Sequence, residues 1–189
     1  MSHSLQFLKE SQLLAECIDP FKVEELADIL SDFKGKLFIL GLGGSSANAS
    51  HAVNDFRKLC GIEAYCPSDN VAELTAIAND EGWENIYGHW LLESNLNDQD
   101  AILILSVGGG TPTVSLPLNN ALGAAKLTGA KILGIVGRDG GETKRMGDCV
   151  IVIPTVNDKR VTPHVESFQS VILHCLVSHP KLQKKATKW

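Results

Sequence analysis

The chain has 189 residues and a mass of 20.4 kDa, a size that suits one domain with its own hydrophobic core. Hydrophobic residues make up 44% and charged residues 21%, a composition that argues against a disordered chain and against a membrane protein. The net charge of -5 gives no general basic surface for nucleic acid, although a local site could still bind a small anion.

The N-terminal residues are polar and lack the basic start and apolar run of a signal peptide. No apolar run approaches the roughly 20 residues of a membrane span. The cysteines are scattered without a C-x-x-C pair, which favours reduced, mostly buried thiols over a zinc knuckle or a redox dithiol. We therefore expect a cytoplasmic protein with no membrane partner.

Two helices are predicted ahead of the sheet. Apolar residues recur at helical spacing over 5–18 and again over 23–33, and Asp19 and Pro20 interrupt the pattern between them. We accordingly divide a single predicted domain, 1–189, into an N-terminal helical segment, 1–34, and an α/β core that ends in a helix, 35–189.

Short apolar runs at 36–40, 101–105, 131–136 and 149–153 are typical of buried parallel strands. The first three end at glycine-rich stretches, and a helical pattern follows the second of these up to about residue 126. Alternating strands and helices predict a doubly wound parallel sheet, the flavodoxin-like α/β/α arrangement of three layers.

The remaining elements are a strand at 61–66 and helices at 71–78, 86–94 and 163–178. The last of these helices carries titratable side chains among apolar neighbours: His164, Glu166 and His174. His164 stands near the helix start, where we expect it to be exposed, with membership of a polar site as the alternative.

Two glycine-rich loops follow predicted strands, and these are the candidate phosphate sites. Glycine lets the backbone turn sharply and approach a ligand, and the free amides of a following helix attract an anion. Plain strand-to-helix turns are the alternative for each loop. Neither loop has the Walker A or the dinucleotide-binding pattern, so no nucleotide cofactor is expected. The candidate binding residues are Gly43, Gly44, Ser45, Ser106, Gly108, Gly109, Gly110 and Thr111.

In combination, the motifs resemble the sugar isomerase (SIS) family and, within it, the phosphoheptose isomerases, over nearly the whole chain. The matching segments are Gly41-x-Gly43-Gly44-Ser45, Ala49-x-His51-x-x-x-Asp55, Asn79-Asp80-x-Gly82, Gly137-Arg138-Asp139-Gly140-Gly141, and Glu166 followed eight residues later by His174.

The resemblance implies an SIS fold, a phosphorylated sugar as ligand, and a homotetramer whose sites lie between subunits. It also implies that the second loop holds the phosphate and that Asn79 and Asp80 contribute to substrate binding. An acid-base pair would come from Asp55 and His174. A zinc ion would be held by His51, Asp55, Glu166 and His174.

Several positions depart from the family pattern, and they bear on the substrate rather than on the fold. Leu42 replaces an asparagine that faces substrate, Asp55 replaces the catalytic glutamate, and Glu166 replaces a glutamine. The remaining departures are Val107 and Gly108, which replace residues of a hydroxyl-richer loop, and Pro163, which replaces an aspartate.

The spacing of the titratable residues permits a shared site. His51 and Asp55 are four apart on one helix and project from the same face. Glu166 and His174 are eight apart, roughly 80° from each other around their helix. Two histidines and two carboxylates suit zinc in ligand type. The alternative is an ion pair between His51 and Asp55, with His174 as a core histidine.

An aldose-ketose isomerase needs a base for the proton next to the carbonyl and an acid that moves a proton between oxygens. Asp55 is the candidate base and His174 the candidate acid. The alternative function is a non-catalytic SIS protein that binds a sugar phosphate or the bacterial replication initiator protein. Direct contact with nucleic acid is not expected in either case.

Overall fold

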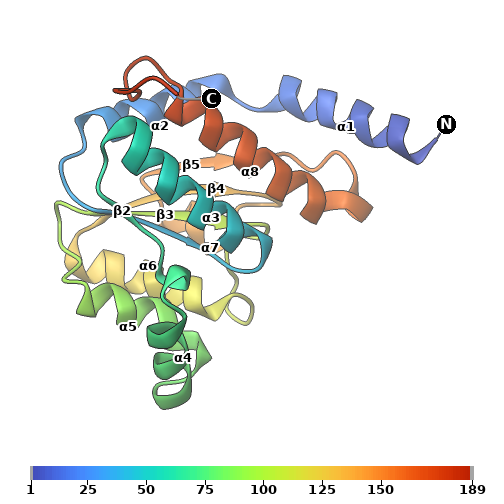
Figure 1. The fold of residues 1–189 in the computed structure, drawn as a ribbon. Helices are drawn as coiled ribbons and strands as arrows, with labels where there is room; N and C mark the ends of the chain where they lie inside the picture. The colour runs from blue at the N-terminus through green and yellow to red at the C-terminus, as the bar shows by residue number, and fades with distance from the viewer. Residues whose placement is uncertain (1, 188–189) are drawn as a thin grey trace.

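The computed structural model describes residues 2–187, in which five parallel strands form one sheet with the order β2-β1-β3-β4-β5 (Figure 1). This order and the parallel pairing confirm the predicted doubly wound α/β fold. The strands are β1 (Leu37–Gly41), β2 (Ala64–Tyr65), β3 (Ala101–Ser106), β4 (Lys131–Val136) and β5 (Cys149–Val152).

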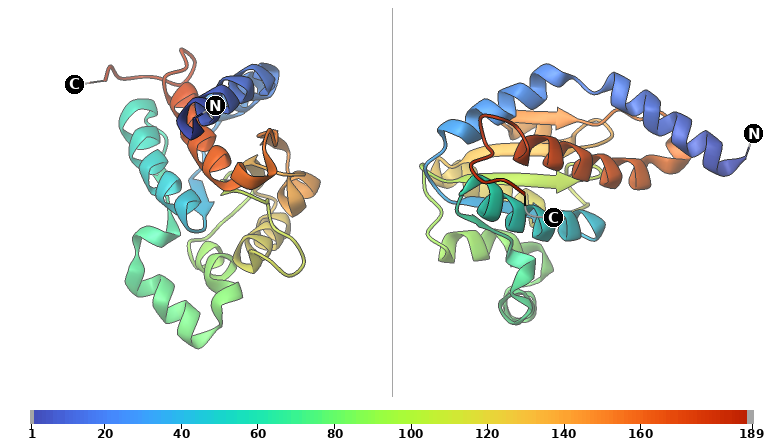
Figure 2. Two further views of the ribbon diagram at one scale, coloured as in Figure 1. Left: turned by 90° about the vertical axis from the view of Figure 1, so that its right-hand side faces the viewer. Right: turned by 45° about the horizontal axis from the view of Figure 1, so that its top comes forward.

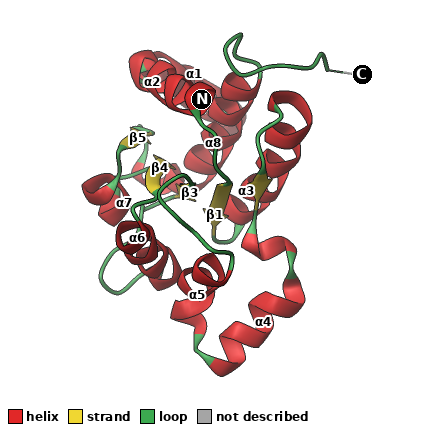
Figure 3. Ribbon diagram, turned by 90° about the vertical axis from the view of Figure 1, so that its left-hand side faces the viewer, coloured by secondary structure: helices red, strands yellow, loops and turns green. Residues whose placement is uncertain are grey.

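Helices cover both faces of the sheet (Figures 2 and 3). One face packs against α2, α3 and α8, and the other against α5 and α6. None of the helices within residues 2–187 has the length and apolar character needed to cross a membrane. The helices are α1 (His3–Cys17), α2 (Pro20–Asp32), α3 (Gly44–Asp55), α4 (Val71–Asp80), α5 (Ile86–Glu93), α6 (Leu116–Thr128), α7 (Gly141–Met146) and α8 (Val161–Val177).

The central strands are buried on both faces, which explains their continuous apolar sequence. Along β1, Leu37 and Ile39 pack against the α2, α3 and α8 layer, whereas Phe38 and Leu40 pack against the α5 and α6 layer. The alternation follows from the period of two in a strand. The sheet is therefore the middle of three layers.

Two predicted segments differ from the structure. The strand expected at 61–66 is reduced to Ala64–Tyr65, because the backbone is still turning after a π-helical segment at Phe56–Cys60 and the Ile62 amide donates back to the Phe56 carbonyl. The helix expected at 71–78 continues to Asp80, so that Asn79 and Asp80 form the last turn of α4.

α1 extends beyond the sheet and is held to the start of α8 by charged and aromatic contacts (Figure 1). Glu10 accepts hydrogen bonds from Arg160 (2.6 and 2.8 Å), and its Oε2 lies 2.9 Å from His164 Nε2. The Phe7 ring stacks on the imidazole of His164 at 4.4 Å between centroids. The expectation that His164 is exposed was wrong, because α1 covers it and leaves it 2% exposed.

Candidate active site

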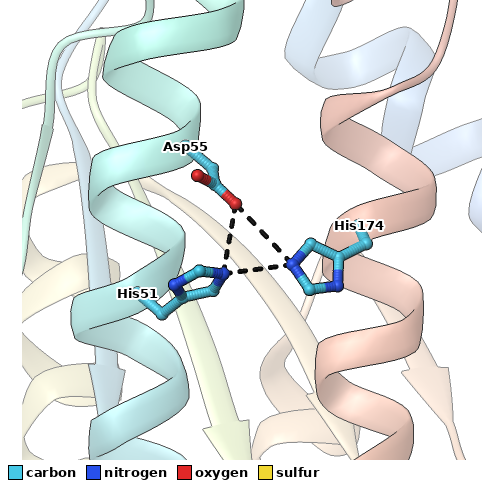
Figure 4. Close-up of side chains that lie close together, drawn as sticks. All are labelled: His51, Asp55 and His174. Atoms are coloured by element: carbon cyan, nitrogen blue, oxygen red, sulfur yellow. Dashed lines mark hydrogen bonds and ion pairs between the residues drawn. The ribbon is translucent and has the colours of Figure 1, made fainter. Parts of the chain in front are cut away.

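Three titratable side chains from α3 and α8 converge on one point, as Figure 4 shows. His51 Nε2 lies 3.0 Å from His174 Nε2 and 3.3 Å from Asp55 Oδ2. His174 Nε2 lies 3.7 Å from the same carboxylate oxygen. We call these three residues the His-Asp-His cluster.

The register between α3 and α8 brings the cluster together. Asn48 donates from Nδ2 to the Glu166 carbonyl (2.8 Å) and accepts at Oδ1 from the Ser170 hydroxyl (2.9 Å). These hydrogen bonds fix how far α3 is shifted along α8. One turn after Asn48, His51 therefore meets His174, and Asp55 follows on the same face of α3.

The cluster faces solvent in a single chain. The side chains of His51 and His174 are 54% and 58% exposed, whereas that of Asp55 is 15% exposed. The alternative of a core histidine at 174 was therefore wrong. The ion pair between His51 and Asp55, which belonged to the same alternative, does form, but it is part of the larger cluster. Asp55 is oriented by both imidazoles and is the most shielded of the three groups.

The donor atoms of the cluster fit a zinc ion in type and spacing. Zinc prefers imidazole nitrogen and carboxylate oxygen at about 2.0–2.2 Å, so its tetrahedral ligands lie roughly 3.3 Å from one another. The three separations in the cluster, 3.0, 3.3 and 3.7 Å, lie on either side of that value. The expected zinc ligands His51, Asp55 and His174 therefore form a suitable three-ligand set.

Glu166, the fourth expected ligand, lies elsewhere in the chain. A Cβ placed on Gly44 would stand 2.5 Å from Glu166 Oε2, so the carboxylate lies against the first turn of α3. His51 is seven residues further along that helix, a rise of about 10 Å. Within one chain, Glu166 does not reach the cluster, and its carboxylate lies beside Gly44 of the first glycine loop.

A cavity of about 870 Å³ opens at the carboxyl ends of the strands, where ligands bind in sheets of this type. Of the expected binding residues, those lining it are Ser45, Ser106, Gly108, Gly110 and Thr111. Leu42 also lines the cavity, so the position that departs from the family asparagine presents an apolar surface there. The expected binding residues outside the lining are Gly43, Gly44, Asn79, Asp80 and Gly109.

A buried tyrosine holds the first loop where it leaves β1. Tyr87 donates its hydroxyl to the Gly41 carbonyl at the end of β1 (2.5 Å). Burial raises the pKa of Tyr87 well above its ordinary value, so the phenol remains a neutral donor. This bond holds the loop that leads to Ser45.

The second loop uses several of its amides for its own structure. The Gly108 and Gly109 amides donate to the Ser106 hydroxyl (3.4 and 3.0 Å), and the Thr111 amide donates to the Val114 carbonyl (3.0 Å). The hydroxyl hydrogens of Ser106 and Thr111 remain as donors toward the cavity, because both oxygens act as acceptors in the loop. The loop is thus a weaker cradle for an anion than its glycines alone would indicate.

Several cavity residues were not singled out from the sequence as site residues, among them Arg138, Asp139, Thr155, Asp158 and Thr162. They follow β4 and β5. The sequence did contain a signal for a binding role of the 137–141 segment, because it is a glycine-rich turn at a strand end and contains the cationic Arg138. The resemblance gave that segment as a family motif without a binding role.

The cavity and the His-Asp-His cluster lie at opposite ends of α3. Ser45 in the first turn lines the cavity, and Asp55 is the last residue of the helix. Ten residues of α-helix span about 15 Å. The cluster instead borders a separate cavity of about 350 Å³ together with Lys58 and Gln183.

Comparisons with known proteins point to one family. A phosphoheptose isomerase from Trichlorobacter lovleyi is 35% identical over 162 residues, which cover 82% of this chain and 78% of that protein. One from Helicobacter pylori strain P12 is 30% identical over 183 residues, covering 93% and 88%. A solved phosphoheptose isomerase from Francisella tularensis has a TM-score of 0.79 at 21% identity, covering 94% of this chain and 93% of that one. No family model matches the chain.

Proposed function

The chain belongs to the phosphoheptose isomerase family of SIS-domain proteins, and from this premise we propose that it isomerises sedoheptulose 7-phosphate with Asp55 and His174 as its acid-base pair. The family makes the chain an aldose-ketose isomerase that acts on a sugar phosphate. The observation that supports these residue roles is the convergence of Asp55, His51 and His174 on one point.

The proposed chemistry assigns a task to each member of the cluster. The Asp55 carboxylate takes the proton from the carbon next to the carbonyl, and the electrons pass into an enediolate. Asp55 then returns the proton to the former carbonyl carbon. His174 donates a proton to one oxygen and accepts one from the other, as the carbonyl moves between C1 and C2. His51, 3.3 Å from Asp55 Oδ2, orients the carboxylate.

We also propose that His51, Asp55 and His174 hold a zinc ion. When bound, such an ion would act as a Lewis acid that stabilises negative charge on the substrate oxygens. The proposal is supported by the donor types and by the separations of 3.0 to 3.7 Å.

The proposed assembly is a cytoplasmic homotetramer with sites between subunits. Three features of the single chain support it: the cluster is exposed, the phosphate cavity lies at the other end of α3, and Glu166 is remote from the cluster. α1 adds exposed leucines, Leu5, Leu8 and Leu13, that a second copy would bury. Sedimentation of the full chain measures this directly, and a monomer at all concentrations would remove it.

Turnover of sedoheptulose 7-phosphate followed by NMR tests the function. Asp55→Asn and His174→Ala are each expected to abolish turnover, with and without added zinc. His89→Ala is the matched control, because His89 Nε2 pairs with Glu93 at 3.3 Å in the same i,i+4 geometry, and no third ligand joins them within residues 2–187. Binding of the sugar phosphate by the wild type without turnover would favour a non-catalytic sugar-phosphate-binding protein instead.

A further inference from the structure

Arg138 is the one cationic side chain among the described residues that line the large cavity. It belongs to the turn after β4, and its backbone φ of 52° lies in the left-handed region that residues with a Cβ seldom adopt. The helix that follows this turn, α7, is bound to the second glycine loop, because the Thr143 hydroxyl and amide both donate to the Gly109 carbonyl (2.8 and 2.9 Å). The strained backbone is thereby held beside the second glycine loop.

The side chain of Arg138 runs along that loop. A Cβ placed on Gly108 would stand 3.7 Å from Arg138 Cδ, so the methylene stem passes over a position that has no side chain of its own. Within residues 2–187, the guanidinium forms no ion pair with a carboxylate. Its charge is therefore available to a ligand in the cavity.

The cavity needs such a charge if it is to bind an anion. The Gly108 and Gly109 amides already donate to Ser106, and the Thr111 amide donates to Val114. Two carboxylates, Asp139 and Asp158, also line the cavity and would repel a phosphate. The remaining neutral donors do not balance a dianion in those surroundings, whereas a guanidinium can form two parallel charged hydrogen bonds to phosphate oxygens.

We propose that Arg138 binds the phosphoryl group of the substrate, an inference that rests on the proposed function and names a binding residue for it. Asp139 accepts a hydrogen bond from the Gly141 amide (3.1 Å) and stabilises the turn that presents Arg138. Asp158 comes from the turn after β5 and suits the hydroxyl groups of the sugar, which can donate to it. The phosphoryl end of the substrate thus lies toward Arg138 and the hydroxyl-bearing end toward Asp158.

Binding of inorganic phosphate, measured by calorimetry on the full chain, tests the role of Arg138 without requiring turnover. Arg138→Gly and Arg138→Gln are expected to raise the Kd for phosphate about 10- to 100-fold. Arg138→Lys keeps the charge, loses the paired geometry and should fall between them and the wild type. Lys126→Gln is the control, because Lys126 is an exposed cation on α6 outside the cavity lining.

The glycine variant separates binding from folding. Glycine adopts a positive φ without strain, so Arg138→Gly should unfold at or above the temperature of the wild type while losing phosphate affinity. An unchanged phosphate Kd in Arg138→Gly, or a wild type that binds no phosphate, would overturn the inference.

Sedoheptulose 7-phosphate separates this inference from the proposed function. Phosphate affinity that depends on Arg138, in a protein without turnover of this sugar, would remove the proposed substrate and leave the inference in place. Turnover of this sugar with an unchanged KM in Arg138→Gly would support the proposed function and remove the role of Arg138.

Discussion

The Nε2 atoms of His51 and His174 lie 3.0 Å apart, although the two residues are 123 positions apart in the chain. Two neutral imidazoles at this distance share one proton as donor and acceptor, and two imidazoles with a carboxylate at similar separations suit a metal ion. The contact joins α3 to α8 and makes the cluster depend on both helices.

Removing either imidazole should weaken zinc binding. We expect His51→Ala and His174→Ala to lower zinc affinity by more than about a hundredfold, because loss of even an outer-shell partner costs 10- to 100-fold. Calorimetric titration with zinc measures the change. His89→Ala should bind zinc as the wild type does, and equally weak binding in all four proteins would exclude the cluster as a zinc site.

Lengthening the carboxylate should not improve the enzyme. Asp55 Oδ2 already lies 3.3 and 3.7 Å from the two imidazoles, so the extra methylene of Asp55→Glu would displace the oxygen. A misplacement of about 1 Å can cost a factor on the order of a hundred, and we expect kcat to fall by about that much. Steady-state kinetics with circular dichroism as a folding check would show it. Higher turnover in Asp55→Glu would mean that the backbone has not adapted to aspartate.

The sequence predicted the fold well because the central strands are buried on both faces and end at glycines. It also placed His51 and Asp55 on one face of a helix, which follows from spacing alone. Spacing could not place them against His174, because the shift of α3 along α8 depends on Asn48 and its bonds to Glu166 and Ser170. That tertiary register also explains why Glu166 meets Gly44 instead of the cluster.

Two other features depended on contacts that periodicity does not reveal. His164 is buried because Glu10 and Phe7 of α1 pack onto it, and a helix pattern gives no information on which distant helix covers a given face. The glycines of the second loop indicated free amides, but the Ser106 hydroxyl accepts from two of them. Local residue types predicted the loop, but its internal hydrogen bonds determine which donors remain free to bind a ligand.

Gly109 should tolerate no side chain, whereas Gly123 should accept one. A Cβ on Gly109 would overlap the Gly140 carbonyl oxygen, and its φ is 70°, so Gly109→Ala strains both glycine turns. Gly123 lies in α6, and no atom of the described residues comes within 4 Å of an added Cβ there. We expect Gly109→Ala to destabilise the fold by about 1–3 kcal/mol and Gly123→Ala to stabilise it by about 0.5–1 kcal/mol.

Chemical denaturation of the two variants measures both changes against the wild type. Both substitutions add the same methyl group, so opposite changes in the free energy of unfolding would report the different surroundings of the two glycines. A Gly109→Ala variant as stable as the wild type would show that the two glycine turns can separate without cost.

Glu10 should make the stability of the fold depend on pH. Hydrogen bonds from Arg160, and next from His164, hold the pKa of the Glu10 carboxyl well below its ordinary value. A carboxyl whose pKa is lower in the folded than in the unfolded state stabilises the fold above the unfolded pKa, near 4.3 for glutamate, and loses that contribution as the pH falls. Glu10→Gln removes the titration while keeping the size of the side chain.

The difference in Tm between the wild type and Glu10→Gln should therefore be large near pH 7 and shrink as the pH falls below about 4.3, where the unfolded carboxyl is already protonated. Thermal unfolding across this pH range measures it. Arg160 remains charged throughout, so the loss of its ion pair with Glu10 at low pH comes from protonation of the carboxyl. Glu93→Gln is the control, because the exposed pair of Glu93 with His89 should contribute little at any pH. A Tm difference for Glu10→Gln that stays constant from about pH 7 to pH 3 would show that α1 is held by packing and not by this charge.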